Sequence, residues 1–325
     1  MNHVCSLLNI QYPIIQGGMG NISNSQLTSA ISEAGGLGTI GAGTMSPDEV
    51  EHLIIETKKK TNKPFAVNIP ISVTPNFKEI FSLVLKHQVP VVSFSAGNPA
   101  PYIPTCHEEG IKVITVTASV KHAKKAEEAG ADIIVAEGYE AAGINSNLEL
   151  TTMTLVPQIV KAVGVPVVAA GGIGDGYGLL AAFALGAQGV QMGTRFIATI
   201  EAPFHEKYKN LIIDANEHET VIVGRSVGRV RRIMKTPYAE KLLEFEKSGI
   251  SLEQFNEHTS EDHHRLGALS GNFEEGFVNA GQISGLINDL PSVKQLLETI
   301  MQEAKEKATN LYHVFHSLQG NDQLS

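Results

Sequence analysis

The sequence VGVPVVAAGGIGDG at residues 163–176, followed by GVQMGTRF at 189–196, contains two short apolar runs that end in glycine-rich turns. Continuous apolar runs of this length are typical of strands buried on both faces, as in a parallel sheet. The helical pattern between them, at 177–185, ends at Leu185-Gly186, where glycine favours the left-handed conformation that closes a helix. We therefore expect a strand–helix–strand unit in which both strands lead into glycine.

The same alternation extends towards the N-terminus. Six more apolar runs rich in Val and Ile precede this unit, at 13–17, 37–43, 65–71, 89–97, 112–119 and 131–138. Helical periodicity lies between most of them, at 25–34, 46–61, 76–87, 120–129 and 152–163. Eight strands alternating with helices predict an α/β fold, a (β/α)8 TIM barrel. An open doubly wound sheet is the alternative, but glycines follow several different strands, which favours a barrel whose strand ends share one mouth.

The alternation stops after Phe196. Residues 201–279 are richer in charge and histidine, with amphipathic helical patterns at 238–247 and 261–269. We expect a small helical lid subdomain here, inserted after strand 8 and lying over the barrel mouth. The barrel domain would then comprise 1–200 and 280–325, with a helix at 292–311 packing back on it and a polar tail at 317–325 that frays.

Composition excludes several function classes. The formal net charge of −9 argues against a nucleic-acid partner, which would require a basic surface. No apolar stretch is long enough to span a membrane, and the N-terminus lacks the features of a signal peptide, so we expect a cytoplasmic protein. Two cysteines, Cys5 and Cys106, are too few for a disulfide framework or a thiolate zinc site, and no metal site is expected.

The turns after the last two strands predict a phosphate site. In TIM barrels these two turns form the usual phosphate-binding position. Gly171, Gly172 and Gly174 allow backbone N–H groups to approach an anion, and the next helix start adds its dipole. Gly193 and Thr194 can add another N–H and a hydroxyl. Arg195 would pair either with the phosphate or with a core carboxylate, and the sequence does not separate these two roles.

Other strand ends carry glycine or polar residues. The first strand ends in QGGMG at 16–20, the third contains Asn68, the fourth ends in GNP at 97–99, and the sixth ends in Glu137-Gly138. Polar residues at the carboxyl ends of barrel strands are typical of functional positions.

Together these motifs resemble the nitronate monooxygenase family, formerly the 2-nitropropane dioxygenases, which includes the FMN-dependent enoyl-acyl-carrier-protein reductase II enzymes. The resemblance rests on QGGMG, VNI, GNP, AEG, TTMTLV, AAGGI, GTRF and AGQ (280–282), and it extends over about residues 8–286. It implies an FMN-binding barrel with a small lid. It implies FMN contacts from Gly17, Gly18, Met19, Asn68, Glu137, Gly138, Gly171, Gly172, Gly193 and Thr194, with Gln282 approaching the flavin from the returning segment.

One position departs from the family pattern. The family usually has a histidine after the sixth strand, in a phrase like E-x-G-G-H-x-G, whereas this chain has Ile144 there. Isoleucine cannot transfer a proton, so base-dependent oxidation of a neutral nitroalkane is in doubt. Asn145 or Ser146 would replace the histidine as a hydrogen-bond donor; the alternative is that Asn145 has only a turn role.

Charged residues of the 201–279 segment allow two interpretations each. His263-His264 beside Glu261 and Asp262 would form either a metal site or, as we favour, a solvated surface. The arginines form a basic group that would either bind a ligand phosphate or make salt bridges between lid and barrel: Arg225, Arg229, Arg231 and Arg232.

These observations predict an FMN-dependent oxidoreductase of the nitronate monooxygenase type, acting on a small molecule, with NADH or NADPH as a candidate electron donor. Enoyl-acyl-carrier-protein reduction is the first alternative. A flavin-binding protein with reduced catalysis, caused by Ile144, is the second, and a barrel for another phosphate ligand such as a nucleotide is the third. A homodimer is left open.

Overall fold

The eight predicted strands form a closed barrel. The computed structural model describes residues 2–320, and its eight-stranded parallel sheet has the order β1-β9-β8-β6-β5-β4-β3-β2. A parallel bridge between Ile15 and Leu37, and a 2.9 Å bond from the Gln16 N–H to the Leu37 carbonyl, join the first strand to the second. The strands are β1 (Ile14–Gln16), β2 (Gly38–Gly41), β3 (Phe65–Pro70), β4 (Val91–Ser95), β5 (Lys112–Thr117), β6 (Ile133–Glu137), β8 (Val167–Ala170) and β9 (Gly189–Met192). The predicted (β/α)8 TIM barrel is confirmed.

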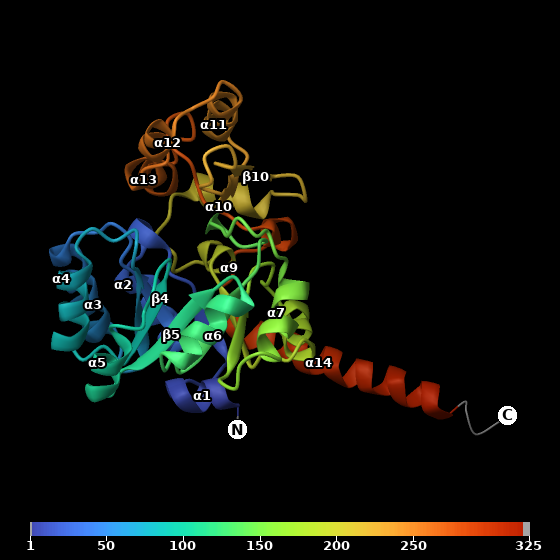
Figure 1. Cartoon of the computed structure of the whole chain (residues 1–325). Helices are drawn as coiled ribbons and strands as arrows, with labels where there is room; N and C mark the ends of the chain where they lie inside the picture. Colours follow the sequence, from blue (N-terminus) through green and yellow to red (C-terminus); the bar gives the residue numbers. More distant parts are fainter. Residues whose placement is uncertain (1, 321–325) are drawn as a thin grey trace.

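Helices surround this sheet (Figure 1). Six of them lie where the helical periodicity predicts: α2 (Ser25–Glu33), α3 (Pro47–Lys60), α4 (Phe77–Lys86), α6 (Val120–Glu128), α7 (Thr152–Val160) and α8 (Gly176–Ala184). Local sequence fixes where they begin, as at α3, where Ser46 and Glu49 form a capping box ahead of Pro47. The short helix α5 (Ile103–Glu108) follows β4 and was not predicted.

One end of the barrel is closed by α1 (His3–Leu8), which the sequence patterns did not predict. Val4 and Leu8 of this helix are buried against residues that point into the barrel, among them Ile15 and Val91. Figure 1 shows α1 below the amino-terminal ends of the strands. Access to the barrel interior is therefore from the opposite end, where the strands finish.

Strand parity decides which side chains reach that open end. Along a strand, side chains alternate between the barrel interior and the helices outside. In β6, Ile133 and Val135 belong to the interior cluster, whereas Ile134 and Ala136 pack outward. Glu137 is the next inward position, at the carboxyl end of the strand.

We expected the segment 201–279 to be helical throughout, but it also contains two strands. It contains α10 (Glu206–Ile213), β10 (Thr220–Val223), β11 (Arg231–Met234), α11 (Pro237–Lys247), α12 (Leu252–His258) and α13 (Glu261–Ser270). The two strands form a three-stranded antiparallel sheet with β7 (Gly143–Ile144), which belongs to the barrel turn after β6. Alternating strand residues such as Val223 and Ile233 pack with Leu242 and Phe255 in a separate apolar cluster. Figure 1 shows this segment above the barrel mouth.

The short helix α9 (Thr194–Ile197) follows β9 and precedes the 201–279 segment, and after that segment the chain returns through the 3-10 turn η2 (Gln282–Leu286) to the long helix α14 (Val293–Gly320). This helix packs on α8 and then projects from the body (Figure 1). Residues 317–320 remain helical, so the predicted fraying is wrong for them, and 321–325 lie outside the described residues. No helix in the described part of the chain is both long and apolar enough to cross a membrane.

Candidate functional site

A cavity of about 940 Å³ lies at the carboxyl ends of the barrel strands. This volume is at the upper end of the range of about 300–1,000 Å³ that is usual for ligand pockets. Most of the site residues predicted from sequence line it: Gly17, Gly18, Met19, Asn68, Glu137, Gly171, Gly172, Gly193 and Thr194, together with Ile144, Asn145 and Ser146.

The turns after β8 and β9 are shaped for close approach to a ligand. Gly171 and Gly172 have φ values of 100° and 70°, a conformation that side chains other than glycine rarely adopt. A Cβ atom on Gly193 would meet no atom within 4 Å, so this residue borders open space. The Thr194 hydroxyl accepts a 2.9 Å hydrogen bond from the Gly281 N–H, which ties the β9 turn to the returning segment. These features fit the backbone cradle that the sequence predicts.

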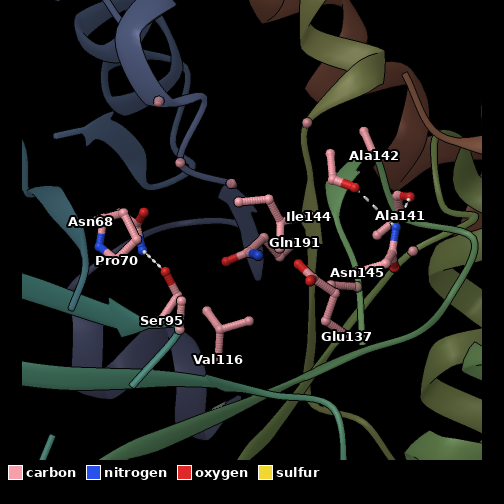
Figure 2. Close-up of a pocket in the computed structure, with 18 of the residues that line it drawn as sticks. Asn68, Pro70, Ser95, Val116, Glu137, Ala141, Ala142, Ile144, Asn145 and Gln191 are labelled. Atoms are coloured by element: carbon pink, nitrogen blue, oxygen red, sulfur yellow. Dashed lines mark hydrogen bonds between the residues drawn. The ribbon is translucent and has the colours of Figure 1, made fainter. Parts of the chain in front are cut away.

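On the other side of the cavity, Gly18 lies directly against Asn68. A Cβ on Gly18 would be 2.3 Å from the Asn68 Oδ1 atom, so only glycine fits. The Asn68 amide is held by donating to the Ser93 carbonyl at 3.1 Å and to the Ser95 hydroxyl at 3.3 Å (Figure 2). Its orientation is therefore fixed before any ligand binds.

Three predicted site residues do not line the cavity. A Cβ on Gly138 would lie 2.1 Å from the Thr152 hydroxyl, and one on Gly174 would lie 2.7 Å from Ile283, so both glycines allow close packing of neighbouring segments. Gln282 has an exposed side chain, and its backbone N–H donates to the Glu140 carbonyl at 3.0 Å.

Arg195 pairs with a carboxylate rather than facing the cavity. Its guanidinium donates to Asp289 at 2.8 Å and to the Ala198 carbonyl at 3.1 Å, and its side chain is buried. Of the two roles left open by the sequence, the structure supports the structural one.

The polar side chains of the loop after β6 form hydrogen bonds within the loop itself. The Asn145 amide donates to the carbonyls of Ala141 and Gly143, at 2.9 and 3.3 Å. The Ser146 hydroxyl accepts a bond from the Leu148 N–H at 3.1 Å. The Ile144 side chain is 52% exposed (Figure 2). Asn145 therefore has the turn role, and its N–H groups are not free to replace the missing histidine.

His264 is not on a solvated surface, which corrects the interpretation made from sequence. Its side chain is buried and lines the cavity together with Glu261, Asn279 and Arg231. The His264 Nδ1–H faces the Glu261 carboxylate at 3.4 Å, and its Nε2 accepts from the Asn279 amide at 3.2 Å. Adjacent helix positions do face different ways, and His263 instead stacks on Tyr238. We call Arg231, Glu261, His264 and Asn279 the roof cluster.

The roof cluster contains two groups of opposite charge, Glu261 and Arg231, and one N–H group of Arg231 has no partner among the described residues. Burial raises the pKa of Glu261, but its hydrogen bond and charge interactions with His264 and Arg231 outweigh this effect and hold the pKa at about 2. The Arg231 guanidinium is 3.8 Å from Glu261 and stacks on the Phe277 ring, and its Nη1 has no hydrogen-bond partner among the described residues. Arg231 and the ionised Glu261 thus bring opposite charges to the cavity, and the Nη1 N–H group of Arg231 is left there without a partner.

The other arginines of the basic group serve the fold. Arg225 pairs with Glu149 at 2.9 Å, and Arg232 donates to the Tyr139 carbonyl at 3.0 Å. Both link the 201–279 segment to the loop after β6, which supports the salt-bridge interpretation for Arg225, whereas Arg232 makes its link through a neutral carbonyl.

Sequence patterns named Arg231, Glu261 and His264 without bringing them together, and they missed Asn279 and Gln191. Gln191 could have been found from strand parity, because it precedes the β9 turn and points into the barrel (Figure 2). The roof cluster offers no comparable local signal, since its members come from three separate segments.

Comparisons with known proteins agree with this geometry. The family model for nitronate monooxygenase matches residues 2–81 and 69–303. A probable nitronate monooxygenase from Staphylococcus saprophyticus is 33% identical, covering 93% of this chain and 97% of its own. Among solved structures, FabK from Thermotoga maritima is 43% identical with a TM-score of 0.92, covering 97% of this chain and 99% of its own. The nitroalkane oxidase from Streptomyces ansochromogenes is 27% identical with a TM-score of 0.85, covering 95% and 99%.

Proposed function

The chain belongs to the nitronate monooxygenase family, an oxidoreductase family, and on this premise we propose that it is an FMN-dependent oxidoreductase that oxidises nitronates. In this proposal the flavin is reduced by the substrate or by NADH or NADPH, and it is reoxidised by oxygen or an organic acceptor. The flavin supplies the redox chemistry, and the protein binds, orients and shields the reactants.

The observation that carries the proposal is the glycine cradle at the β8 and β9 turns. Gly171 and Gly172 have left-handed backbone, and Gly193 borders open space, so backbone N–H groups and a phosphate can approach without a Cβ between them. Gly18 and the fixed amide of Asn68 provide a second close surface across the cavity. We propose that the first group holds the FMN phosphate and that the second lies against the ring system.

An anionic substrate suits the remainder of the cavity. The Arg231 charge is offset by the ionised Glu261 carboxylate 3.8 Å away, but the Arg231 Nη1 N–H group has no partner among the described residues and is available to donate to an anion. A nitronate is already an anion, so its oxidation does not depend on the proton transfer for which Ile144 is unsuited.

Enoyl-thioester reduction is the second candidate. The 43% identity to FabK favours it, and so does a cavity large enough for a cofactor and a further ligand. This reaction would use NADH or NADPH as the donor.

A visible spectrum of the purified protein is the first test, and we expect bound oxidised flavin. Anaerobic addition of a nitronate should then bleach the flavin, and air should restore it. The second candidate would be favoured if NADH or NADPH bleaches the flavin, an enoyl thioester reoxidises it, and a nitronate gives no turnover. Bound flavin that no donor bleaches would indicate reduced catalysis, and a colourless protein that cannot be loaded with FMN would refute the proposal in favour of another phosphate ligand.

A further inference from the structure

Glu137 occupies the centre of the cavity floor. It follows Ile133 and Val135 on the inward side of β6, so strand parity directs its side chain towards the barrel axis. Figure 2 shows its carboxyl group pointing into the cavity, between Gln191 and the loop that carries Asn145. A small adjoining pocket also has Glu137 in its wall.

The Glu137 carboxyl group is not neutralised by the protein. No hydrogen bond or ion pair to this group is present within residues 2–320, in contrast to the neighbouring Glu140, which accepts bonds of 2.9–3.0 Å from the Thr152 N–H and hydroxyl. Burial alone raises the pKa of Glu137 from an ordinary 4.5 to about 7. The group can therefore carry a proton or release it near neutral pH, which is the range in which a general acid or base works best.

Apart from Glu137 and from Arg231, whose Nη1 atom is unpartnered, the buried ionisable groups of the cavity are bonded to partners among the described residues. The Tyr208 hydroxyl donates to the Asn279 carbonyl, and both ring nitrogens of His264 are bonded within the roof cluster. Glu261 faces His264 and Arg231, and its pKa of about 2 keeps it ionised.

Two further ionisable groups line the cavity, His122 and Lys125 of α6, and both are exposed to solvent. Neither contributes to the raised pKa of Glu137, for which burial is the sole cause. Glu137 thus differs from these groups in being half-buried at the wall of the cavity with no bonded partner among the described residues.

We propose that Glu137, beyond the flavin contact that the family resemblance implies, exchanges a proton with the substrate, the role for which the residue at position 144 is unsuited in this chain. The inference rests on the proposed function. With a neutral nitroalkane, the Glu137 carboxylate takes the proton from the carbon that bears the nitro group. The C–H bond breaks, its electron pair stays on the substrate as the nitronate, and Glu137 becomes a neutral carboxylic acid.

The first test is an infrared titration of the protein without substrate, comparing wild type with Glu137→Gln. We expect a carboxylic-acid C=O band that disappears with a midpoint near pH 7 and that the variant lacks. A Glu137 group that is already ionised at mildly acidic pH, as ordinary glutamates are, would overturn the inference. This measurement does not depend on which substrate the enzyme uses.

The second test compares a nitroalkane with its preformed nitronate, which differ only by the proton. Glu137→Gln should slow flavin reduction by the neutral nitroalkane by about a hundred- to ten-thousandfold, the range for loss of general acid–base catalysis. Reduction by the nitronate should change much less, and Glu137→Asp should recover part of the loss. Glu298→Gln, an exposed glutamate on α14, is the matched control and should behave as wild type.

Flavin content and the wild-type rates distinguish a failure of the proton-transfer role of Glu137 from a failure of the proposed function. Equal losses with both substrates would show that Glu137 holds the flavin or the fold, and would overturn the proton-transfer role. A wild-type protein that oxidises neither substrate would refute the proposed function, and the infrared midpoint would then decide the inference by itself.

Discussion

Replacing Gly193 with alanine should separate flavin binding from folding. Gly193 lies between β9 and α9, and its backbone has a φ of −117°, which alanine adopts without strain. No atom lies within 4 Å of the position that a new Cβ would take, so the methyl group does not disturb the packed protein. Because Gly193 lines the cavity, the methyl group instead occupies space that a phosphate would need.

The two expected effects have opposite signs. Replacing an unstrained glycine with alanine restricts the unfolded chain, which stabilises the folded apoprotein by about 0.4–1 kcal/mol. Loss of one hydrogen bond to a charged phosphate removes about 1.5–3 kcal/mol of binding free energy, which corresponds to a roughly ten- to hundredfold increase in Kd for FMN.

Urea unfolding of the apoprotein and fluorescence titration with FMN measure the two effects independently, because ligand-free unfolding contains no contribution from binding. Gly164→Ala is the matched control, since a Cβ there would meet only Glu127, at an ordinary distance of 3.5 Å, and Gly164 does not line the cavity. It should gain similar stability and keep its FMN affinity. Unchanged affinity in Gly193→Ala would refute the assignment of this turn to the phosphate.

Four further predictions follow from other parts of the site. Glu137→Gln should have a free energy of unfolding that exceeds that of wild type by up to about 3 kcal/mol above pH 7 and by almost nothing below pH 4.5, because between these values the wild-type carboxyl ionises in the unfolded chain but stays protonated in the folded one; parallel urea-derived curves against pH would contradict this. Gly18→Ala should destabilise the protein by about 1–3 kcal/mol in urea unfolding, since its Cβ would collide with the hydrogen-bonded Asn68. His264→Leu should lower stability by about 1–3 kcal/mol or more, because it leaves buried polar partners unsatisfied, and an unchanged thermal midpoint would contradict the roof cluster. Asn145→Ala should leave FMN affinity unchanged in a fluorescence titration and slow substrate oxidation through a looser loop, and unchanged turnover would exclude even this indirect role.

The barrel could be predicted from sequence because its determinants are local. Most strands are runs of largely apolar residues, and a glycine after several of the helices, as at Gly35, Gly130 and Gly186, marks the turn to the next strand. The elements that the sequence did not predict are those whose structure depends on contacts with distant parts of the chain. Helix α1 is six residues long and is stabilised by burying Val4 and Leu8 inside the barrel, a contact with strands that its own sequence does not reveal.

The strands β10 and β11 were missed for a related reason. Arg231 and Arg232 read as a basic group, yet both are buried in β11, one stacked on Phe277 and the other bonded to the Tyr139 carbonyl. Tertiary contacts therefore decide the secondary structure of this segment, and charge pattern alone gives the wrong impression of an exposed surface.

The floor of the site could be predicted from local sequence patterns, whereas its roof could not. The floor consists of glycines and inward-facing strand residues, whose positions follow from strand parity and turn chemistry. The roof depends on contacts between α13, β11 and the segment near Asn279, which are far apart in sequence. The sequence therefore indicates where a phosphate would bind but not which charged groups would face the substrate.

The replacement of histidine by Ile144 has a structural consequence that reaches beyond that position. Residues 143 and 144 are held in β7 by pairing with β11, and the Asn145 N–H bonds the Val230 carbonyl at 2.9 Å. The side chain at position 144 therefore lines the cavity whatever its chemistry, and isoleucine makes this part of the wall apolar. Isoleucine offers no polar partner to a carboxyl group that lines the same cavity, and burial raises the pKa of Glu137 there to about 7. The change that removes one proton-transfer group thus favours the environment in which a carboxylic acid on the floor can act as another.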